Sequence, residues 1–240
     1  MSIEKKERIY NGKEKTIYTT SNPAELLVHF KDIVTAFGGI KRARLKDKGK
    51  YNNLISALIF EKLEKGGIKT HFISLEGEHE QLCRKVEPIP IKVIVRNRLC
   101  GTTARLLALE EGTEIPNVVY ELRYNNDDLG DPMINSHHAV ALGLASYAEL
   151  GEIFDIARKA NDILLKFFHE CGIELIDFKM EFGRSEDGSI MVSDEISPDK
   201  ARLWDESTGR KLDKDRFRHD LSDVCASYRE IYERLYKPVL

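Results

Sequence analysis

One segment constrains the fold of this 240-residue chain more than any other, the stretch Gly-Ile-Glu-Leu-Ile-Asp-Phe-Lys-Met-Glu-Phe-Gly at residues 172–183. Side chains alternate between the two faces of a β-strand. One face of this segment is therefore apolar and carries Ile176, Phe178, Met180 and Phe182. The other face carries Asp177, Lys179 and Glu181. Because the apolar face must be buried, the pattern predicts a packed strand that holds two carboxylates around a lysine.

The charged face of this strand is a candidate site for a metal ion and phosphates. Asp187-Gly188 predicts a hairpin turn, and the returning strand brings Asp194 and Glu195 within reach. Clustered carboxylates suit Mg²⁺ with the phosphates of a nucleotide, and the lysine can neutralise charge on a transferring phosphoryl group. A row of cross-strand ion pairs on an exposed sheet face would produce the same pattern, so both interpretations stay open.

A second candidate site covers residues 96–103, Arg-Asn-Arg-Leu-Cys-Gly-Thr-Thr, where a predicted strand ends and a helix begins. Helix amides, threonine hydroxyls, a permissive glycine and arginine side chains together can bind a phosphomonoester. Arg202, close to Trp204, could supply a further guanidinium group. The alternative is an ordinary capped helix start with solvated arginines.

Two lysines also follow a predicted turn in Gly12-Lys13-Glu14-Lys15. They could cover the phosphates of ATP. Taken alone, this short string is explained better by a solvated run of charges.

We expect the chain to divide at residue 88. Residues 1–87 contain mainly short strand patterns, a hairpin around Asn11-Gly12 and one helix over residues 52–65. Pro88 and Pro90 then interrupt the pattern, because proline cannot donate to a strand ladder.

Residues 88–240 are predicted to form a larger α+β unit. It is expected to begin with a strand from Ile91, a helix over 102–111 and a long loop with short strands over 114–139. A helix from the Ser146–Glu149 capping box to Gly172 follows. A closing helix is expected over 215–235, with Leu221 inward. The whole chain is therefore predicted to be α+β, with two lobes and antiparallel sheets.

Composition excludes several classes of protein. Hydrophobic residues make up 42% and charged residues 32% of the chain, and the net charge is −3. That balance is typical of a soluble globular protein and offers no overall field for nucleic acid. No stretch is apolar enough for a membrane span or a secretory signal, so we expect a cytoplasmic protein. The four cysteines are scattered, which disfavours disulfides and structural zinc.

The motifs together resemble one family, phosphoribosylaminoimidazole-succinocarboxamide synthase, also called SAICAR synthetase. The resemblance runs nearly end to end through Gly12-Lys13-Glu14-Lys15, Thr35-Ala36-Phe37, Thr70-His71-Phe72, Val95-Arg96-Asn97-Arg98, Gly130-Asp131-Pro132, residues 177–183, residues 194–199 and Arg202-Leu203-Trp204. The chain departs from the family pattern at Gly38, Asn125 and Ala201.

The resemblance implies a fold and an activity. The fold has a small, mostly antiparallel lobe that binds nucleotide (residues 1–87) and a larger lobe that carries substrate and metal (residues 88–240), a layout related to protein kinases and ATP-grasp enzymes. The implied reaction joins L-aspartate to 5-amino-1-(5-phospho-D-ribosyl)imidazole-4-carboxylate (CAIR) in purine biosynthesis, with ATP as co-substrate and Mg²⁺ as cofactor. It gives SAICAR, ADP and phosphate through an acyl phosphate. A homodimer is also implied.

The resemblance further implies roles for individual residues. The catalytic pair is Asp177 and Lys179, and the metal ligands are Glu181 and Asp194. The ATP contacts are Lys13, Lys15, Lys85, Val86 and Glu87. The substrate contacts are Arg96, Thr102, Asp131, Asp199 and Arg202. Arg218 is a separate hypothesis for the contact with L-aspartate, which the resemblance does not supply.

Two rival functions remain open at this point. A small-molecule kinase on the same scaffold would release ADP without aspartate. A catalytically silent nucleotide-binding module would bind ATP without turnover.

Overall fold

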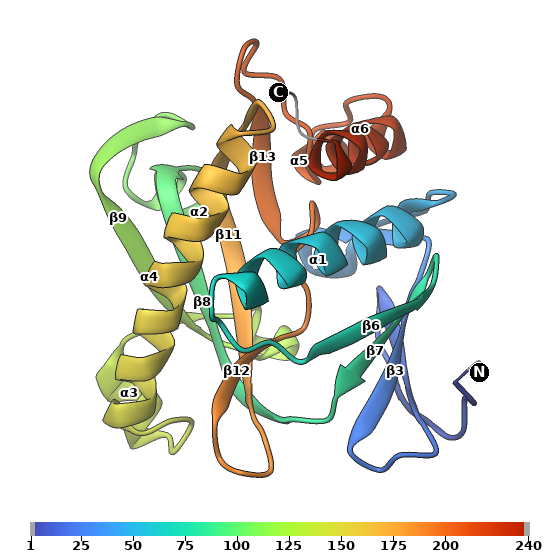
Figure 1. Ribbon diagram of the computed structural model, residues 1–240. Coiled ribbons are helices and arrows are strands. Elements are labelled where there is room, and N and C mark those ends of the chain that lie inside the picture. Colours follow the sequence, from blue (N-terminus) through green and yellow to red (C-terminus); the bar gives the residue numbers. More distant parts are fainter. Residues whose placement is uncertain (1–2, 238–240) are drawn as a thin grey trace.

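A computed structural model describes residues 3–237 of the chain, and antiparallel sheets organise it (Figure 1). The first sheet has five strands in the order β1-β2-β3-β7-β6. Its strands are β1 (Arg8–Asn11), β2 (Lys15–Thr19), β3 (Glu25–Phe30), β6 (Phe72–Gly77) and β7 (Glu80–Arg84). The predicted hairpin at Asn11-Gly12 joins β1 to β2, since Asn11 pairs with Thr16 across it.

The second sheet has six strands and is centred on β11. Its strands are β8 (Glu87–Leu99), β9 (Thr113–Tyr124), β10 (Met133–Ile134), β11 (Ile173–Arg184), β12 (Ile190–Ser193) and β13 (Ala201–Asp205). β8 pairs with one edge of β11, while β12 and β13 share its other edge. The segment at residues 172–183 therefore forms a central strand, as its alternation predicts.

Helices cover these sheets and join them. The long helices are α1 (Lys48–Lys65), α4 (Tyr147–His169) and α6 (Val224–Tyr236). The short elements are β4 (Ile33–Ala36), η1 (Phe37–Gly39), β5 (Lys41–Arg44), α2 (Gly101–Leu106), η2 (Asp127–Leu129), α3 (Ser136–Ala141) and α5 (Asp215–Arg218). α4 crosses one face of the six-stranded sheet, and α1 runs beside it toward the five-stranded sheet (Figure 1).

The main hydrophobic cluster is shared between these parts. Ile55, Phe60 and Leu63 of α1 lie in the same cluster as Leu164 of α4 and Phe178 of β11. Burial of such side chains is the principal favourable contribution to folding, at roughly 1.5–3 kcal/mol for each large side chain. The α+β class is confirmed, but the predicted lobe boundary remains a prediction. The sheet changes at Glu87, while the core continues across that point.

Three element predictions are wrong. The helix predicted over 102–111 is α2 alone, and Ala108 adopts a left-handed backbone soon after it (φ 55°). The loop predicted over 114–139 begins with the long strand β9, which pairs with β8. The closing helix predicted over 215–235 is divided into α5 and α6 by Asp220 and Asp223, both with positive φ. Residues in that conformation cannot continue a right-handed helix.

The two prolines do not interrupt the chain as expected. Both lie in β8, where Pro88 pairs with Gly183 and Pro90 falls in a register irregularity between Ile89 and Lys92. Proline is tolerated at strand starts and bulges, because no ladder hydrogen bond is lost there.

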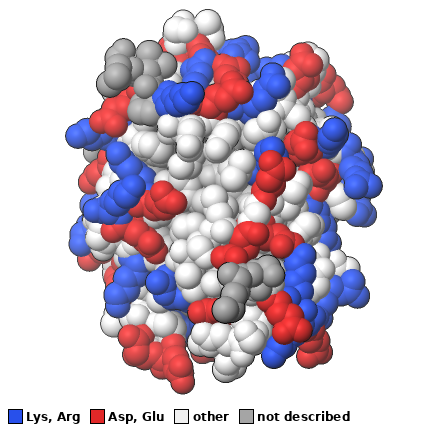
Figure 2. Space-filling view, turned by 45° about the vertical axis from the view of Figure 1, so that its right-hand side comes forward, with Lys and Arg blue, Asp and Glu red and all other residues white. Residues whose placement is uncertain are grey.

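The surface carries no large region of a single charge on the face shown in Figure 2. Uncharged residues gather in the middle of that face, and basic and acidic side chains alternate around them. No helix within residues 3–237 is long and apolar enough to cross a membrane.

Candidate active site

The carboxylates predicted to bind metal lie beside two lysines from distant parts of the chain. Glu181 of β11 pairs in register with Ser193, the last residue of β12, and Asp194 follows directly. Lys200 Nζ lies 3.0 Å from Asp194 Oδ2 and 3.7 Å from Glu181 Oε1. Lys15 at the start of β2 forms an ion pair with Asp194. The structure thus joins the first sheet to the second at these carboxylates.

Further polar groups surround Glu181. Lys92 Nζ of β8 lies 2.8 Å from Asp131 Oδ2 and 3.8 Å from Glu181 Oε1. Asn125 donates its side-chain amide to Glu181 Oε2 at 2.9 Å. Asp131 has a positive φ (52°) and accepts a hydrogen bond from the backbone of Asn126. This predicted substrate residue is therefore part of the same cluster.

Burial and neighbouring charges shift the pKa values of Glu181 and Asp194 in opposite directions. Burial raises the pKa of Glu181, and the charge of Asp194 adds to that effect. Although burial opposes it, Lys15 and Lys200 hold the pKa of Asp194 below its usual range. One of these buried carboxyl groups is hard to ionise, and its neighbour is ionised. A divalent cation between them would stabilise the ionised form of both. Glu181 and Asp194 therefore fit the predicted Mg²⁺.

Asp177 lies between two arginines. Arg96 of β8 donates to Asp177 Oδ2 at 2.5 Å, and Arg202 of β13 donates to the same oxygen at 2.7 Å. Nε and Nη2 of Arg96 both donate to Glu121 of β9, and the arginine side chain is 4% exposed. Arg96 therefore has little surface for a ligand. Arg96 supports Asp177, and its contact with substrate stays a prediction.

Arg202 and Arg218 meet at one buried carboxylate. Arg202 Nε donates to Asp215 Oδ2 at 2.8 Å, and Arg218 donates to Asp215 Oδ1. A Cβ atom at Gly101 would lie 2.4 Å from Arg202 Nη2, so only glycine lets α2 approach this guanidinium so closely. Both arginines retain some exposed surface, at 17% and 26% of their side chains.

Lys179 faces a cluster of positive charge. Burial, followed by the charges of Lys200, Arg218 and Lys92, lowers the pKa of Lys179 to about 7. Within residues 3–237 its ammonium group has no ion pair. Like charges gathered around a half-buried lysine raise the free energy of the unliganded site. An anionic ligand would relieve that repulsion, so the arrangement suits binding of phosphate or carboxylate groups.

The other predicted residues lie at varied distances from this cluster. Lys13 pairs with Asp127 of η2 at 3.0 Å. Thr102 is exposed at the second position of α2. Lys85 and Glu87 are exposed at the start of β8, and the side chain of Val86 packs against Gly183. The side chain of Lys85 makes no ion pair with the carboxylates described above.

Asp199 is held by protein partners, and its contact with substrate stays a prediction. Its carboxylate is 0% exposed and forms an ion pair with Lys48 of α1. Tyr228 of α6 also donates to it at 2.7 Å. We therefore assign Asp199 to the support of the loop between β12 and β13.

Sequence reasoning missed several residues of the cluster. The missed residues are Lys92, Lys200, Glu121, Lys214 and Asp215. One signal was available for Lys92, which is a charged residue inside the otherwise apolar run Ile91–Val95. The others lie in segments whose packing partners are far away in the sequence.

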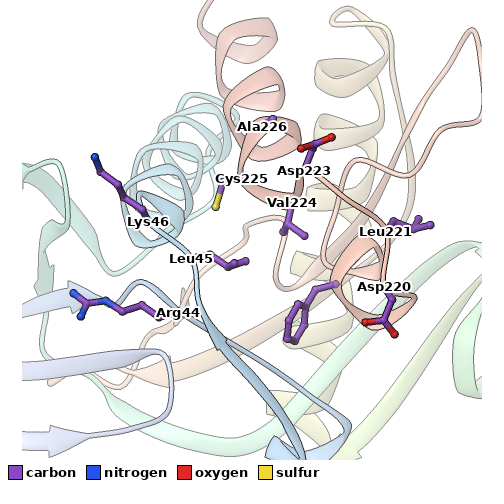
Figure 3. Close-up of a pocket in the computed structure, with 10 residues that line it drawn as sticks. Arg44, Leu45, Lys46, Asp220, Leu221, Asp223, Val224, Cys225 and Ala226 are labelled. Atoms are coloured by element: carbon purple, nitrogen blue, oxygen red, sulfur yellow. The ribbon is translucent and has the colours of Figure 1, made fainter.

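A cavity of ≈ 580 Å³ lies outside this cluster (Figure 3). Leu45 and Val224 point toward its interior, between the chain that follows β5 and the start of α6. No residue predicted to bind ATP, metal or substrate lines it. Phe217, the neighbour of Arg218, forms part of its wall.

Fold and site together define a class of protein, an α+β enzyme in which lysines, arginines and paired carboxylates converge from two antiparallel sheets and form a site suited to anionic ligands. The family model described as SAICAR synthetase matches residues 8–235. The chain belongs to the SAICAR synthetase family.

Individual relatives match the chain over nearly its whole length. It is 52% identical to the phosphoribosylaminoimidazole-succinocarboxamide synthase of Clostridium botulinum strain Okra, over 98% of this chain and 100% of that protein. The crystal structure of the Ehrlichia chaffeensis synthase superposes with a TM-score of 0.94 at 43% identity, covering 98% of this chain and all of that one. A type-2 SAICAR synthetase in complex with ADP gives a TM-score of 0.92 at 45% identity, covering 96% and 99%.

Proposed function

We propose that this chain catalyses the ATP-dependent ligation of L-aspartate to CAIR, giving SAICAR, ADP and phosphate in purine biosynthesis. The observation that carries the proposal is the full-length match to SAICAR synthetases, one of them in complex with ADP. The cluster of cations and carboxylates supports it, because every substrate of this reaction carries carboxylate or phosphate groups.

Lys13 and Lys15 approach the phosphates of ATP in this proposal. In the structure they form ion pairs with Asp127 and Asp194. Phosphate oxygens are stronger partners for lysine than a partly exposed carboxylate, so the lysines exchange partners when ATP binds. Residues 85–87, which include the backbone of Val86, contact the adenine.

Arg202, Thr102 and Asp131 hold CAIR, and Arg218 holds L-aspartate. Arginine suits this role because its planar group can donate two parallel hydrogen bonds to a phosphate or carboxylate. Asp215 already fixes the orientation of both arginines.

Glu181 and Asp194 would hold Mg²⁺. The ion supplies charge neutralisation on the phosphoryl group that is transferred. Asn125 keeps Glu181 oriented through its amide.

The reaction proceeds through an acyl phosphate. A carboxylate is a poor acyl donor, so a carboxylate oxygen of CAIR first attacks the γ-phosphorus of ATP and ADP leaves. The aspartate amine then attacks the acyl carbon, phosphate leaves and the amide bond forms. The Lys179 ammonium, stabilised by the bound anions, offsets the negative charge on the reacting oxygens. Asp177 holds Arg202 in place throughout.

A homodimer and a cytoplasmic location complete the proposal. The dimer rests on the family resemblance, and the location rests on the sequence pattern, which contains no apolar stretch of the length that a membrane span or a secretory signal needs. Size-exclusion chromatography with light scattering tests the dimer. Fractionation of the source cells tests the location.

The function is tested by ADP release from purified protein with Mg²⁺ and ATP. CAIR and L-aspartate are added singly and together, and the product mass is measured. Turnover that needs both substrates and yields the mass of SAICAR is expected. Release of ADP without aspartate would instead indicate a kinase.

The acyl phosphate is tested separately with ¹⁸O in the CAIR carboxylate. Label is expected in the phosphate product, because the attacking oxygen leaves with phosphorus. Unlabelled phosphate would rule out this route.

A further inference from the structure

Three consecutive residues tie the first hairpin to distant parts of the chain. Lys13 pairs with Asp127, and Lys15 pairs with Asp194. Between them, Glu14 accepts a hydrogen bond from Lys214 Nζ at 2.6 Å. Each partner follows β8 in the sequence, so this turn is held against the larger sheet by side chains.

The three ion pairs differ in how they respond to a nucleotide. Phosphates are anions and compete with Asp127 and Asp194 for the two lysines. Lys214 is not one of the lysines proposed to contact the phosphates. The Glu14–Lys214 pair is therefore expected to persist when ATP binds.

Both members of this pair are embedded in the protein. The side chains of Glu14 and Lys214 are 15% and 9% exposed. The same Glu14 oxygen also accepts from the hydroxyl of Thr35 at 3.1 Å. The amide of Lys214 donates to the carbonyl of Pro198. An ion pair with this little exposure is screened much less by water than a surface pair.

Lys214 is adjacent to the residue that orients the proposed substrate arginines. Asp215 follows it directly and accepts hydrogen bonds from Arg202 and Arg218. A change at Glu14 thus reaches those arginines through one ion pair and one peptide unit. In the other direction, Glu14 lies between the two lysines proposed to contact the phosphates.

We propose that Glu14 and Lys214 are a positioning pair that couples nucleotide binding to CAIR binding. The inference rests on the proposed function. Binding of either ligand orders one side of the ion pair, and the pair transmits that order to the other side. Each ligand therefore increases the affinity for the other by the same factor.

The test measures the Kd of ADP with Mg²⁺ by calorimetry, with and without saturating CAIR. The ratio of the two Kd values is the coupling factor. Glu14→Gln removes the charge but retains the shape and an oxygen for Thr35, and Lys214→Met removes the charge and retains the stem. Each is expected to lower the coupling factor about tenfold. The double variant is expected to lose no more than either single one.

Two controls separate coupling from general stability. Lys214→Arg retains the positive charge and is expected to keep most of the coupling. Glu230→Gln removes the more exposed ion pairs of Glu230 with Arg210 and Arg234, none of which belongs to the proposed site, and is expected to leave the coupling unchanged.

The outcomes are distinct. Variants with a lower melting temperature but an unchanged coupling factor would show that the pair is merely structural and would overturn the inference. Wild-type protein that binds ADP and CAIR independently would overturn it as well. Wild-type protein that binds neither ligand would refute the proposed function, and the inference with it.

Discussion

Arg96 holds two buried carboxylates, so its removal is expected to affect stability before it affects ligand binding. Arg96→Ala removes one cationic partner from each of two almost fully buried carboxylates, and leaves Glu121 with Arg123 and Asp177 with Arg202. Breaking a buried ion pair from one side typically costs about 3–5 kcal/mol. We expect a loss of that size in the free energy of unfolding, measured with urea.

Arg158→Ala is the matched control for this change. Arg158 forms an exposed ion pair with Asp155 on α4, and loss of such a pair costs roughly 0–1 kcal/mol. If Arg96→Ala unfolds at the same urea concentration as Arg158→Ala, the buried network is not what holds this part of the sheet.

Replacement of Lys179 is expected to abolish activity without lowering stability. Lys179→Met removes a charge that Lys200, Arg218 and Lys92 repel, and retains the apolar stem. A half-buried lysine with a lowered pKa costs stability near neutral pH, because the unfolded chain keeps it charged in water. The variant should therefore melt at or above the wild-type temperature while turnover is abolished.

Lys200→Met provides the contrast, since it breaks ion pairs with Asp194 and Glu181 and should lower the melting temperature. Calorimetry and the ADP-release assay check both variants. Near-normal turnover by Lys179→Met would remove this lysine from the mechanism.

At the scale of single residues, the sequence predicted the features that depend on the alternation of side chains along one strand. Strand alternation was enough to find Asp177, Lys179 and Glu181, because one strand fixes their common face. The charged groups that pair with them or face them are Arg96, Lys92 and Lys200, which arrive from other elements. Only the register of β8 on β11 and the loop after β12 bring these groups together, and neither can be read from a local pattern.

At the scale of elements, the start of α4 gives a pH-dependent prediction. Ser146 and Glu149 form a complete capping box, and Arg184 of β11 donates to Glu149. The hydrogen bond from Arg184, followed by that from the Ser146 backbone, lowers the pKa of Glu149 to about 2. The folded state therefore binds this proton less readily than the unfolded chain. The stabilisation is fully present above pH 4.5 and is lost as the pH falls from there toward 2.

Glu149→Gln should thus destabilise the protein by about 1 kcal/mol at pH 7 and by less at pH 3. Urea unfolding at the two pH values measures the difference. Glu152→Gln, on the exposed side of the same helix, is the control. An equal effect of Glu149→Gln at both pH values would contradict the assigned role of its charge.

Elements with strong periodicity or caps could be predicted, and the others could not. α4 has a regular apolar stripe and a capping box, and its predicted start agrees with the structure. β9 was missed because its many polar residues and Pro116 resemble a loop, while pairing with β8 makes it a strand. The break between α5 and α6 depends on the positive φ of Asp220 and Asp223, which aspartate tolerates without any sequence signature.

At the scale of the whole molecule, the shared core governs how the chain unfolds. Ile55, Ile59 and Phe60 of α1 belong to the same cluster as the residues of α4 and β11. The smaller cluster beneath the five-stranded sheet contains Val28, Phe30 and Cys83, with Ile17 against it. So small a cluster cannot offset the conformational entropy of ordering about ninety residues. The predicted boundary at residue 88 is therefore not expected to separate two independently stable units.

We accordingly predict one cooperative transition for the full chain. Scanning calorimetry should give equal calorimetric and van't Hoff enthalpies. A fragment of residues 1–87 should lack cooperative unfolding by circular dichroism, because the apolar face of α1 would be exposed to water. ADP with Mg²⁺, at a hundred times the Kd of ADP, should raise the free energy of unfolding by about 2.7 kcal/mol. The transition should remain single. Two resolved transitions, with only the first shifted by ADP, would show instead that the nucleotide-binding part folds by itself and that the core across residue 88 contributes little to its stability.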